Sequence, residues 1–207
     1  MALLNGTDRA AGKARSGNGS WRFRVPAWAA AAVILFVALS ATTAHCADPE
    51  PTREQLIKAA FVYRIAKFVE WPSPFPGPPD APLTFCVTAE DDTFLAAFNT
   101  IKGKTVKGRQ IRVKAYEGPG DLSDCCLLFI SGKMDQKIAS LLSPPPTSTV
   151  LTVGDVEYFA EQGGMISLVT SARKIKLAVN VVAVERAGIK ISAKLLALAR
   201  IVKTNDE

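Results

Sequence analysis

Apolar residues recur along the chain in patterns that predict helices and strands. Thr52 and Gln55 match a capping box at the start of an apolar-periodic stretch that continues to Val69, which predicts a helix there. Its large apolar residues share one face: Ile57, Phe61, Ile65 and Phe68. Trp71 and Pro72 end this pattern and lead into a proline-rich loop.

Shorter patterns alternate over the rest of the chain. Predicted strands occupy residues 83–88, 111–115, 125–130, 149–153, 165–169 and 174–179. Predicted helices occupy residues 92–101, 133–142, 155–161 and 180–187, and a last helix begins after Ser192 with Leu195, Leu198 and Val202 as its stripe. Because strands and helices mostly alternate, we expect a three-layer α/β domain with a mostly parallel sheet, an antiparallel hairpin and flanking helices.

Residues 1–44 predict an export signal rather than part of the domain. Arg22 and Arg24 precede an apolar run of 16 residues, and small residues follow it. The run is shorter than the roughly 20 residues of a comfortable membrane span, although an uncleaved anchor helix is the alternative. We predict cleavage after Ala44, with cleavage after Ala47 as the alternative. Residues 45–207 then form a single domain in the periplasm.

Charge and histidine content exclude several classes of function. The chain has 207 residues and a net charge of +6, but removal of residues 1–44 leaves 20 basic and 18 acidic residues. Nucleic-acid binding thereby loses its electrostatic support. The only histidine, His45, lies at the predicted cut, so the domain has none for a catalytic triad or a His-ligated metal.

Two glycine motifs do not support nucleotide chemistry. Gly103-Lys104-Thr105 has Phe98 where a phosphate-binding loop needs its first glycine, and a predicted helix precedes it. Gly163-Gly164 fits a helix stop rather than a dinucleotide fingerprint. We therefore expect neither a cofactor nor enzymatic activity.

The remaining candidate residues suggest binding. Tyr63, Lys67 and Trp71 have the spacing of one helix face, which could meet a partner, although Trp71 could simply pack under the proline loop. Ser131 follows a buried strand, where α/β sheets place ligands. With Thr88 and Asp155 it defines a crevice for a small ligand, which is the alternative function.

The cysteines admit one disulfide. Cys86 lies in one predicted strand, and Cys125 and Cys126 open another with side chains on opposite faces, so at most one of these two bonds Cys86. Three buried thiols are the alternative. Export favours the disulfide, and the residues alone leave its second member open.

Several of these segments together resemble the YfiR family of periplasmic regulators. The resemblance spans residues 52–203 and rests on strings that occur in the family's order: LIKAAFVYRIAKFVEWP (56–72), FCVT (85–88), GKTVKGR (103–109), CCLLFIS (125–131), VLTVGD (150–155), GGMI (163–166) and ISAKLLALA (191–199). The helix string with GGMI and KLL is specific, whereas each string alone is weak.

The resemblance implies a non-enzymatic, dimeric protein that represses the periplasmic sensor domain of an inner-membrane diguanylate cyclase of the YfiN type. It thereby implies control of cyclic di-GMP and biofilm formation. A histidine kinase is the other expected target, and an outer-membrane lipoprotein is a further expected partner. The resemblance also implies a disulfide between Cys86 and Cys125. We place partner binding near Gly163, Gly164, Met165 and Arg173.

Overall fold

The structure, a computed structural model, describes residues 50–72, 78, 80–88, 92–118, 122–132, 149–171 and 174–203. All of them belong to one compact unit, residues 47–207. The predicted signal segment and the predicted helix over 133–142 lie outside the described residues. Within the described part, no helix combines the length and apolarity needed to cross a membrane.

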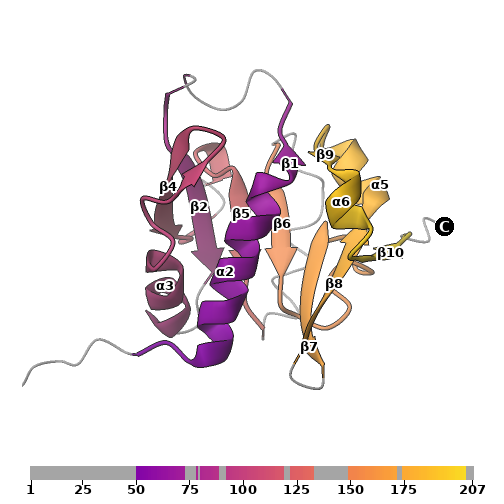
Figure 1. Cartoon of the computed structure of the whole chain (residues 1–207), viewed down its shortest axis with the longest axis horizontal. Coiled ribbons are helices and arrows are strands. Elements are labelled where there is room, and N and C mark those ends of the chain that lie inside the picture. Colours follow the sequence, from indigo (N-terminus) through magenta and orange to yellow (C-terminus); the bar gives the residue numbers. More distant parts are fainter. Residues whose placement is uncertain are drawn as a thin grey trace, which may run out of the picture. The chain divides into compact units, whose positions relative to one another are not determined.

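The described residues form four α-helices and ten strands, and the six strands β3 to β8 follow one another without a described α-helix between them (Figure 1). The helices are α2 (Arg53–Lys67), α3 (Asp92–Asn99), α5 (Val181–Arg186) and α6 (Ala193–Leu196). The strands are β1 (Val69–Glu70), β2 (Leu83–Thr88), β3 (Thr105–Val106), β4 (Arg109–Ala115), β5 (Leu127–Ile130), β6 (Leu151–Gly154), β7 (Ile166–Ser171), β8 (Lys174–Asn180), β9 (Lys190–Ile191) and β10 (Arg200–Val202).

Eight of these strands form one mixed sheet in the order β10-β8-β7-β6-β5-β2-β4-β3. Neighbours are parallel except in two pairs, the β7–β8 hairpin and β3–β4. β1 and β9 pair antiparallel as a separate two-stranded sheet. The prediction of an α/β domain with a mostly parallel sheet and an antiparallel hairpin is confirmed.

The N-terminal capping box of α2 is present. The Thr52 hydroxyl accepts from the Gln55 amide at 3.3 Å, and the Gln55 side chain accepts from the Thr52 amide at 2.7 Å. Because both unpaired amides are satisfied, the helix begins where the pattern predicts. It ends at Lys67, earlier than predicted, because Val69 and Glu70 pair with Ile191 and Lys190.

Both faces of the sheet are buried. On one face, alternate strand residues such as Phe85, Phe129 and Val153 pack against α2, α3, α5 and α6 in a single core. Figure 1 shows α2 crossing the front of the sheet, with α3 to one side of it and α5 and α6 to the other. On the other face, a smaller cluster contains the Cys86–Cys125 pair and Phe159.

The predicted helix over residues 155–161 is wrong, because the chain forms successive turns there. A Cβ atom on Gly154 would lie 2.6 Å from the Phe159 ring, and one on Gly164 would lie 2.2 Å from it. The ring therefore fits only between two glycines. Tyr158 adopts a φ of 60°, which a continuing α-helix does not allow.

The last predicted helix is also only partly correct. It ends at Leu196, and Val202 belongs to a strand rather than to a helical stripe. Arg200–Val202 pair in parallel with Ala178–Asn180. Ile201 and Val202 are β-branched, and the vacant sheet edge beside β8 satisfies their backbone groups.

Candidate functional site

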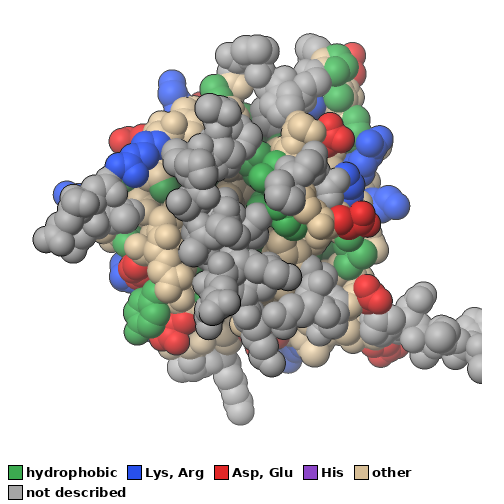
Figure 2. Space-filling view, turned by 180° about the vertical axis from the view of Figure 1, so that it is seen from behind, with side chains coloured by type: hydrophobic (Ala, Val, Ile, Leu, Met, Phe, Trp, Pro, Cys, Tyr) green, Lys and Arg blue, Asp and Glu red, His purple; other side chains and the backbone are tan. Residues whose placement is uncertain are grey.

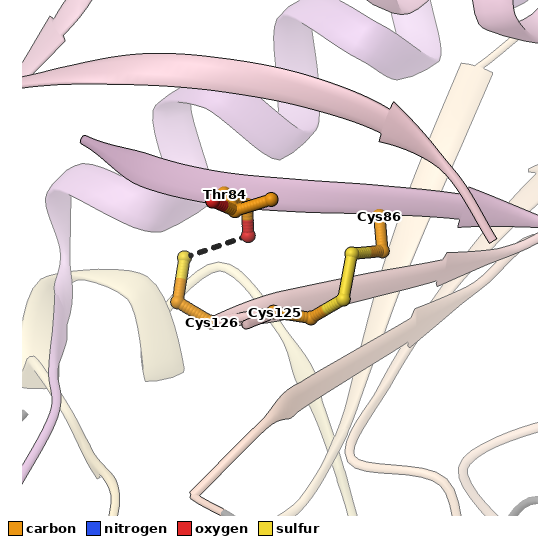
Figure 3. The surroundings of a disulfide bond; sticks show 4 residues. All are labelled: Thr84, Cys86, Cys125 and Cys126. Atoms are coloured by element: carbon orange, nitrogen blue, oxygen red, sulfur yellow. Dashed lines mark hydrogen bonds between the residues drawn. A yellow bond between two sulfur atoms is a disulfide. The ribbon is translucent and has the colours of Figure 1, made fainter. Parts of the chain in front are cut away.

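A disulfide joins Cys86 to Cys125 on the sheet face opposite α2 (Figure 3). Their Cα atoms are 5.8 Å apart, and 39 positions separate them along the chain. This is the pairing that the family resemblance implies. Neighbouring strands β2 and β5 bring the two residues together, because β2 pairs with β5 in parallel register.

Cys126 is the free cysteine of the described residues, and it is buried in the core on the α2 side of the sheet. Its thiol donates to the Thr84 carbonyl at 3.1 Å (Figure 3). Burial raises the pKa of this thiol to about 12. Since the thiolate is the reactive form, Cys126 has the chemistry of a structural thiol rather than of a nucleophile.

The predicted stripe of Tyr63, Lys67 and Trp71 does not lie on one helix face, because Trp71 follows the end of α2. The Lys67 ammonium lies 4.4 Å from the centre of the Tyr63 ring, and that of Lys104 lies 5.4 Å from it. Trp71 instead donates from Nε1 to the Cys126 carbonyl at 3.0 Å and packs against the core. Tyr63 is therefore flanked by two lysines, whereas Trp71 has a packing role.

Ser131 and Thr88 lie at the carboxyl ends of β5 and β2. The chain passes from β2 to β4 on one side and returns to β5 on the other, so the sheet reverses its strand order between them. Ser131 is buried and donates its hydroxyl to the Thr88 carbonyl at 2.8 Å, while its amide donates to the Thr88 hydroxyl at 3.2 Å. These polar groups therefore hold the two strand ends together.

The segment with Gly163, Gly164 and Met165 forms the turn from the Phe159 loop into β7. Gly163 has a φ of 101°, which favours glycine, and the Gly164 amide donates to the Phe159 carbonyl at 2.9 Å. Met165 packs against the core. Arg173 lies outside the described residues. Partner binding by this segment stays a prediction.

A partly buried ionic network ties α2 to the carboxyl end of β6, and the sequence pattern did not predict it. The Lys58 ammonium lies 2.9 Å from Asp155 and 2.7 Å from Glu54, and the Thr170 hydroxyl donates to Glu54 at 2.8 Å. The Asp155 side chain is 4% exposed. A lysine within an apolar helix pattern was the available signal, because such a cation needs a partner.

Burial and hydrogen bonding act in opposite directions in this network. Burial raises the pKa of Asp155, and the hydrogen bond from Lys58 only partly offsets it. Burial opposes the charge of Lys58, but its hydrogen bonds with Glu54 and Asp155 outweigh burial and raise its pKa. The hydrogen bonds from Lys58 and Thr170 lower the pKa of Glu54.

The apolar stripe predicted on α2 lies mostly at the surface. Of its four residues only Ile65 is buried, whereas Ile57, Phe61 and Phe68 are 36–40% exposed. The buried face instead consists of Gln55, Lys58, Ala59, Val62, Ile65 and Ala66. Leu198, which precedes β10, is 80% exposed, and Ile201, which lies in β10, is 46% exposed.

Three of these exposed residues, Phe61, Phe68 and Leu198, line a groove of about 730 Å³. It lies between α2, β8 and the α6–β10 segment, and we call it the α2 groove. Its lining is Phe61, Arg64, Ile65, Phe68, Ile175, Lys176, Leu177, Leu195, Leu198 and Arg200. The charged members are all cationic.

A smaller cavity of about 280 Å³ lies beside α5 and β9. It is lined by Val179, Val181, Val184, Glu185, Ile189, Lys190, Ile191 and Leu196. Across the described residues, no three His, Cys, Asp or Glu side chains are grouped as metal ligands.

Similarity to solved structures is weak. One match is a crystal structure of a conserved domain protein from Vibrio cholerae O1 biovar El Tor, with a TM-score of 0.49 and 13% identity over 74% of this chain and 61% of that chain. Another is an ABC domain in complex with L-Trp from Streptococcus pneumoniae, with a TM-score of 0.44 and 13% identity over 72% of this chain and 60% of that one. The chain thus spans about 60% of the length of each.

Comparison with curated proteins gave no match. A family model described as YfiR/HmsC-like matches residues 55–200. Proteins of this family are periplasmic, and they are regulatory rather than catalytic. The match includes α2 from Gln55 onward, every strand of the sheet as far as the start of β10, and both cysteines of the disulfide. The chain belongs to the YfiR/HmsC-like family.

Proposed function

We propose that this chain is a periplasmic, non-enzymatic regulator of an inner-membrane signalling protein. It binds the periplasmic sensor domain of that protein and holds it inactive. The first expected target is a diguanylate cyclase, whose restraint lowers cyclic di-GMP, and a histidine kinase is the other. Membership of the YfiR/HmsC-like family supports regulation of cyclic di-GMP signalling.

The observation that carries this proposal is the exposed apolar surface of α2. Ile57, Phe61 and Phe68 are large side chains that the fold leaves 36–40% exposed, and Phe61 and Phe68 line the α2 groove. Contiguous exposed apolar surface marks interaction sites in soluble proteins. A regulator that acts by binding needs this surface and a stable scaffold, and it needs no catalytic group.

Repression then follows from differential affinity. A protein that binds only the inactive state of a two-state sensor shifts the population toward that state in proportion to its affinity ratio. Moving a sensor from 1:99 to 99:1 takes a preference of about 10⁴-fold. The disulfide supports this role in the periplasm, because it stabilises a small domain in an oxidising compartment.

The test is genetic and quantitative. Deletion of the gene in the source bacterium should raise cyclic di-GMP, measured by mass spectrometry of nucleotide extracts. Plasmid-borne wild-type chain should restore the lower level, and a version lacking residues 1–44 should not, because it stays in the cytoplasm. Unchanged cyclic di-GMP and unchanged kinase output in the deletion strain would contradict the proposal.

A further inference from the structure

We propose that the α2 groove binds an amphipathic helix of a partner protein, with apolar side chains in the groove and acidic residues toward its cationic rim. This inference rests on the proposed function, because the sensor protein is the expected owner of that helix.

The groove has the composition of a helix-binding surface. Seven of its lining residues are large and apolar: Phe61, Ile65, Phe68, Ile175, Leu177, Leu195 and Leu198. Leu198, at 80% exposed, extends this apolar wall into solvent. Grooves of this kind take the apolar face of an amphipathic helix through anchors spaced at i, i+3, i+4 and i+7.

The charge of the rim selects the partner. Arg64, Lys176 and Arg200 line the groove, and no acidic residue does. Arg200 pairs with Glu161, but no ion pair within the described residues involves Arg64 or Lys176. On the face opposite α2, acidic and basic side chains of described residues both appear around the margin (Figure 2). An acidic segment therefore complements the groove.

The same charges disfavour a second copy of this chain. A twofold axis at the groove would place the Arg64 and Lys176 of both copies in one interface, with no acidic lining residue to pair with them. Like charges placed together across an interface cost several kcal/mol. The concave shape likewise disfavours a flat lipid surface, since a bilayer cannot enter a groove of about 730 Å³.

Internal bonds hold the groove open before binding. The Lys58–Asp155 pair anchors the start of α2 to β6. The Ser192 amide donates to the Phe68 carbonyl at 2.9 Å and anchors the end of α2 to the α6 segment. Because both walls are fixed, a partner helix binds without first ordering this surface.

The first experiment measures binding of synthetic helices to the full chain by fluorescence anisotropy. One peptide of about 18 residues carries Leu on one face and Glu on the other, and its matched partner carries Lys in place of Glu. We expect the acidic peptide to bind at least about tenfold tighter and its affinity to fall with salt. Equal affinities, or no binding of either peptide, would overturn the proposal.

Variants locate the binding. Arg64→Glu should abolish the preference for the acidic peptide, and Phe61→Ser should weaken the binding of both peptides. Arg112→Glu on β4 and Tyr158→Ser, which change an exposed cation and an exposed aromatic outside the lining, are the matched controls and should change neither. Equal losses in variants and controls would contradict binding in the groove.

Two further measurements exclude the other occupants. Binding of the chain to anionic phosphatidylglycerol vesicles that Arg64→Glu abolishes, with no peptide preference, would make the groove a membrane surface. A wild-type dimer that Phe61→Ser converts to a monomer, measured by analytical ultracentrifugation, would make it a homodimer interface. Either result overturns the proposal.

Measurements in cells separate this inference from the proposed function. If deletion of the gene raises cyclic di-GMP but Phe61→Ser and Arg64→Glu still repress, the regulator stands and the groove inference fails. If deletion changes no signalling output, the proposed function itself fails.

A photocrosslinker at position 198 should join the chain to a periplasmic segment of its target with acidic and apolar residues at helical spacing. Crosslinking to a basic segment would contradict the inference.

Discussion

Both faces of α2 carry apolar residues, but those of one face pack against the sheet and those of the other lie at the surface. Ala59, Val62 and Ala66 are fully buried. Ile57 and Phe61, on the other side of the same helix, are 40% and 36% exposed. The buried face includes the small residues Ala59 and Ala66, which let the helix backbone approach the sheet closely.

The difference shows which apolar surface the fold itself uses. The core is complete without Ile57 and Phe61, because the sheet is already covered by the residues of the other face. Large apolar side chains that a fold leaves exposed lower solubility, and they are expected where another molecule covers them. One face of α2 therefore contributes to stability, and the exposure of the other supports the proposal that it binds a partner.

The sharpest test of this assignment is a charge on each face. Val62→Asp places an unpaired carboxylate in the core and should cost at least about 4 kcal/mol of unfolding free energy or prevent folding. Ile57→Asp, on the exposed face, should cost about 1 kcal/mol or less. Urea denaturation followed by circular dichroism measures both. Equal costs would show that the two faces do not differ in their contribution to stability.

Much of the fold could be predicted from the sequence, because local chemistry determines it. The capping box at Thr52 and Gln55 predicted the start of α2, and the continuous apolar run over residues 125–130 predicted the buried strand β5. The Asn180 side chain accepts from the Ala183 amide at 3.0 Å, which begins α5 where its helix was expected. In each case the deciding interaction lies within a few residues.

The sequence-based predictions fail where residues far apart in the chain determine the local structure. The four-residue stripe on α2 has perfect helical spacing, but the position of the sheet determines which face is buried, and only Ile65 of the stripe is. The Phe159 loop depends on Gly154 and Gly164, and β10 depends on the free edge of β8. The Lys58–Asp155 pair joins residues 97 positions apart, and no local pattern shows that distance.

The disulfide tests whether the opposite face of the sheet supports the domain without shaping the groove. Replacing Cys86 and Cys125 by Ala removes a covalent link between residues 39 positions apart in the chain. This should lower the unfolding free energy by about 3 kcal/mol, because the unfolded chain is no longer constrained. Because the disulfide lies away from α2, peptide binding by the folded variant should be unchanged. Thermal denaturation and anisotropy measure the two quantities, and loss of peptide binding at full folding would contradict the separation of the faces.

Lys58 tests what fixes the rotation of α2. Lys58→Met leaves the buried Asp155 carboxylate without its cation and should cost about 2 kcal/mol at pH 7. Burial already raises the pKa of Asp155, and loss of Lys58 raises it further. A carboxyl group with a raised folded pKa gives stability that is present at low pH and lost as pH rises through that pKa.

The cost of Lys58→Met should therefore be smaller at pH 4 than at pH 8, measured by urea denaturation at both values against the wild type. Glu54→Gln is the control, because its side chain is half exposed and its neutral oxygen still accepts from Lys58. A cost that is independent of pH would show that Asp155 is not the group left unpaired.

The smallest effect concerns Cys126, which belongs to the core on the α2 side. Its folded pKa is raised to about 12, from 9.0 in the open chain, so above pH 9 the unfolded chain ionises and the folded chain does not. Stability should fall by about 1.4 kcal/mol for each pH unit above 9 through this thiol, and Cys126→Ala should lack that loss. The measurement is the change in unfolding free energy from pH 8 to pH 10 in both proteins.

The native wild-type protein should also resist a thiol reagent at pH 8 and react only in urea. Fast labelling of the native thiol, or identical pH slopes, would mean that this side of the core opens readily, and α2 would then lack the fixed position on which the distinction between its faces depends.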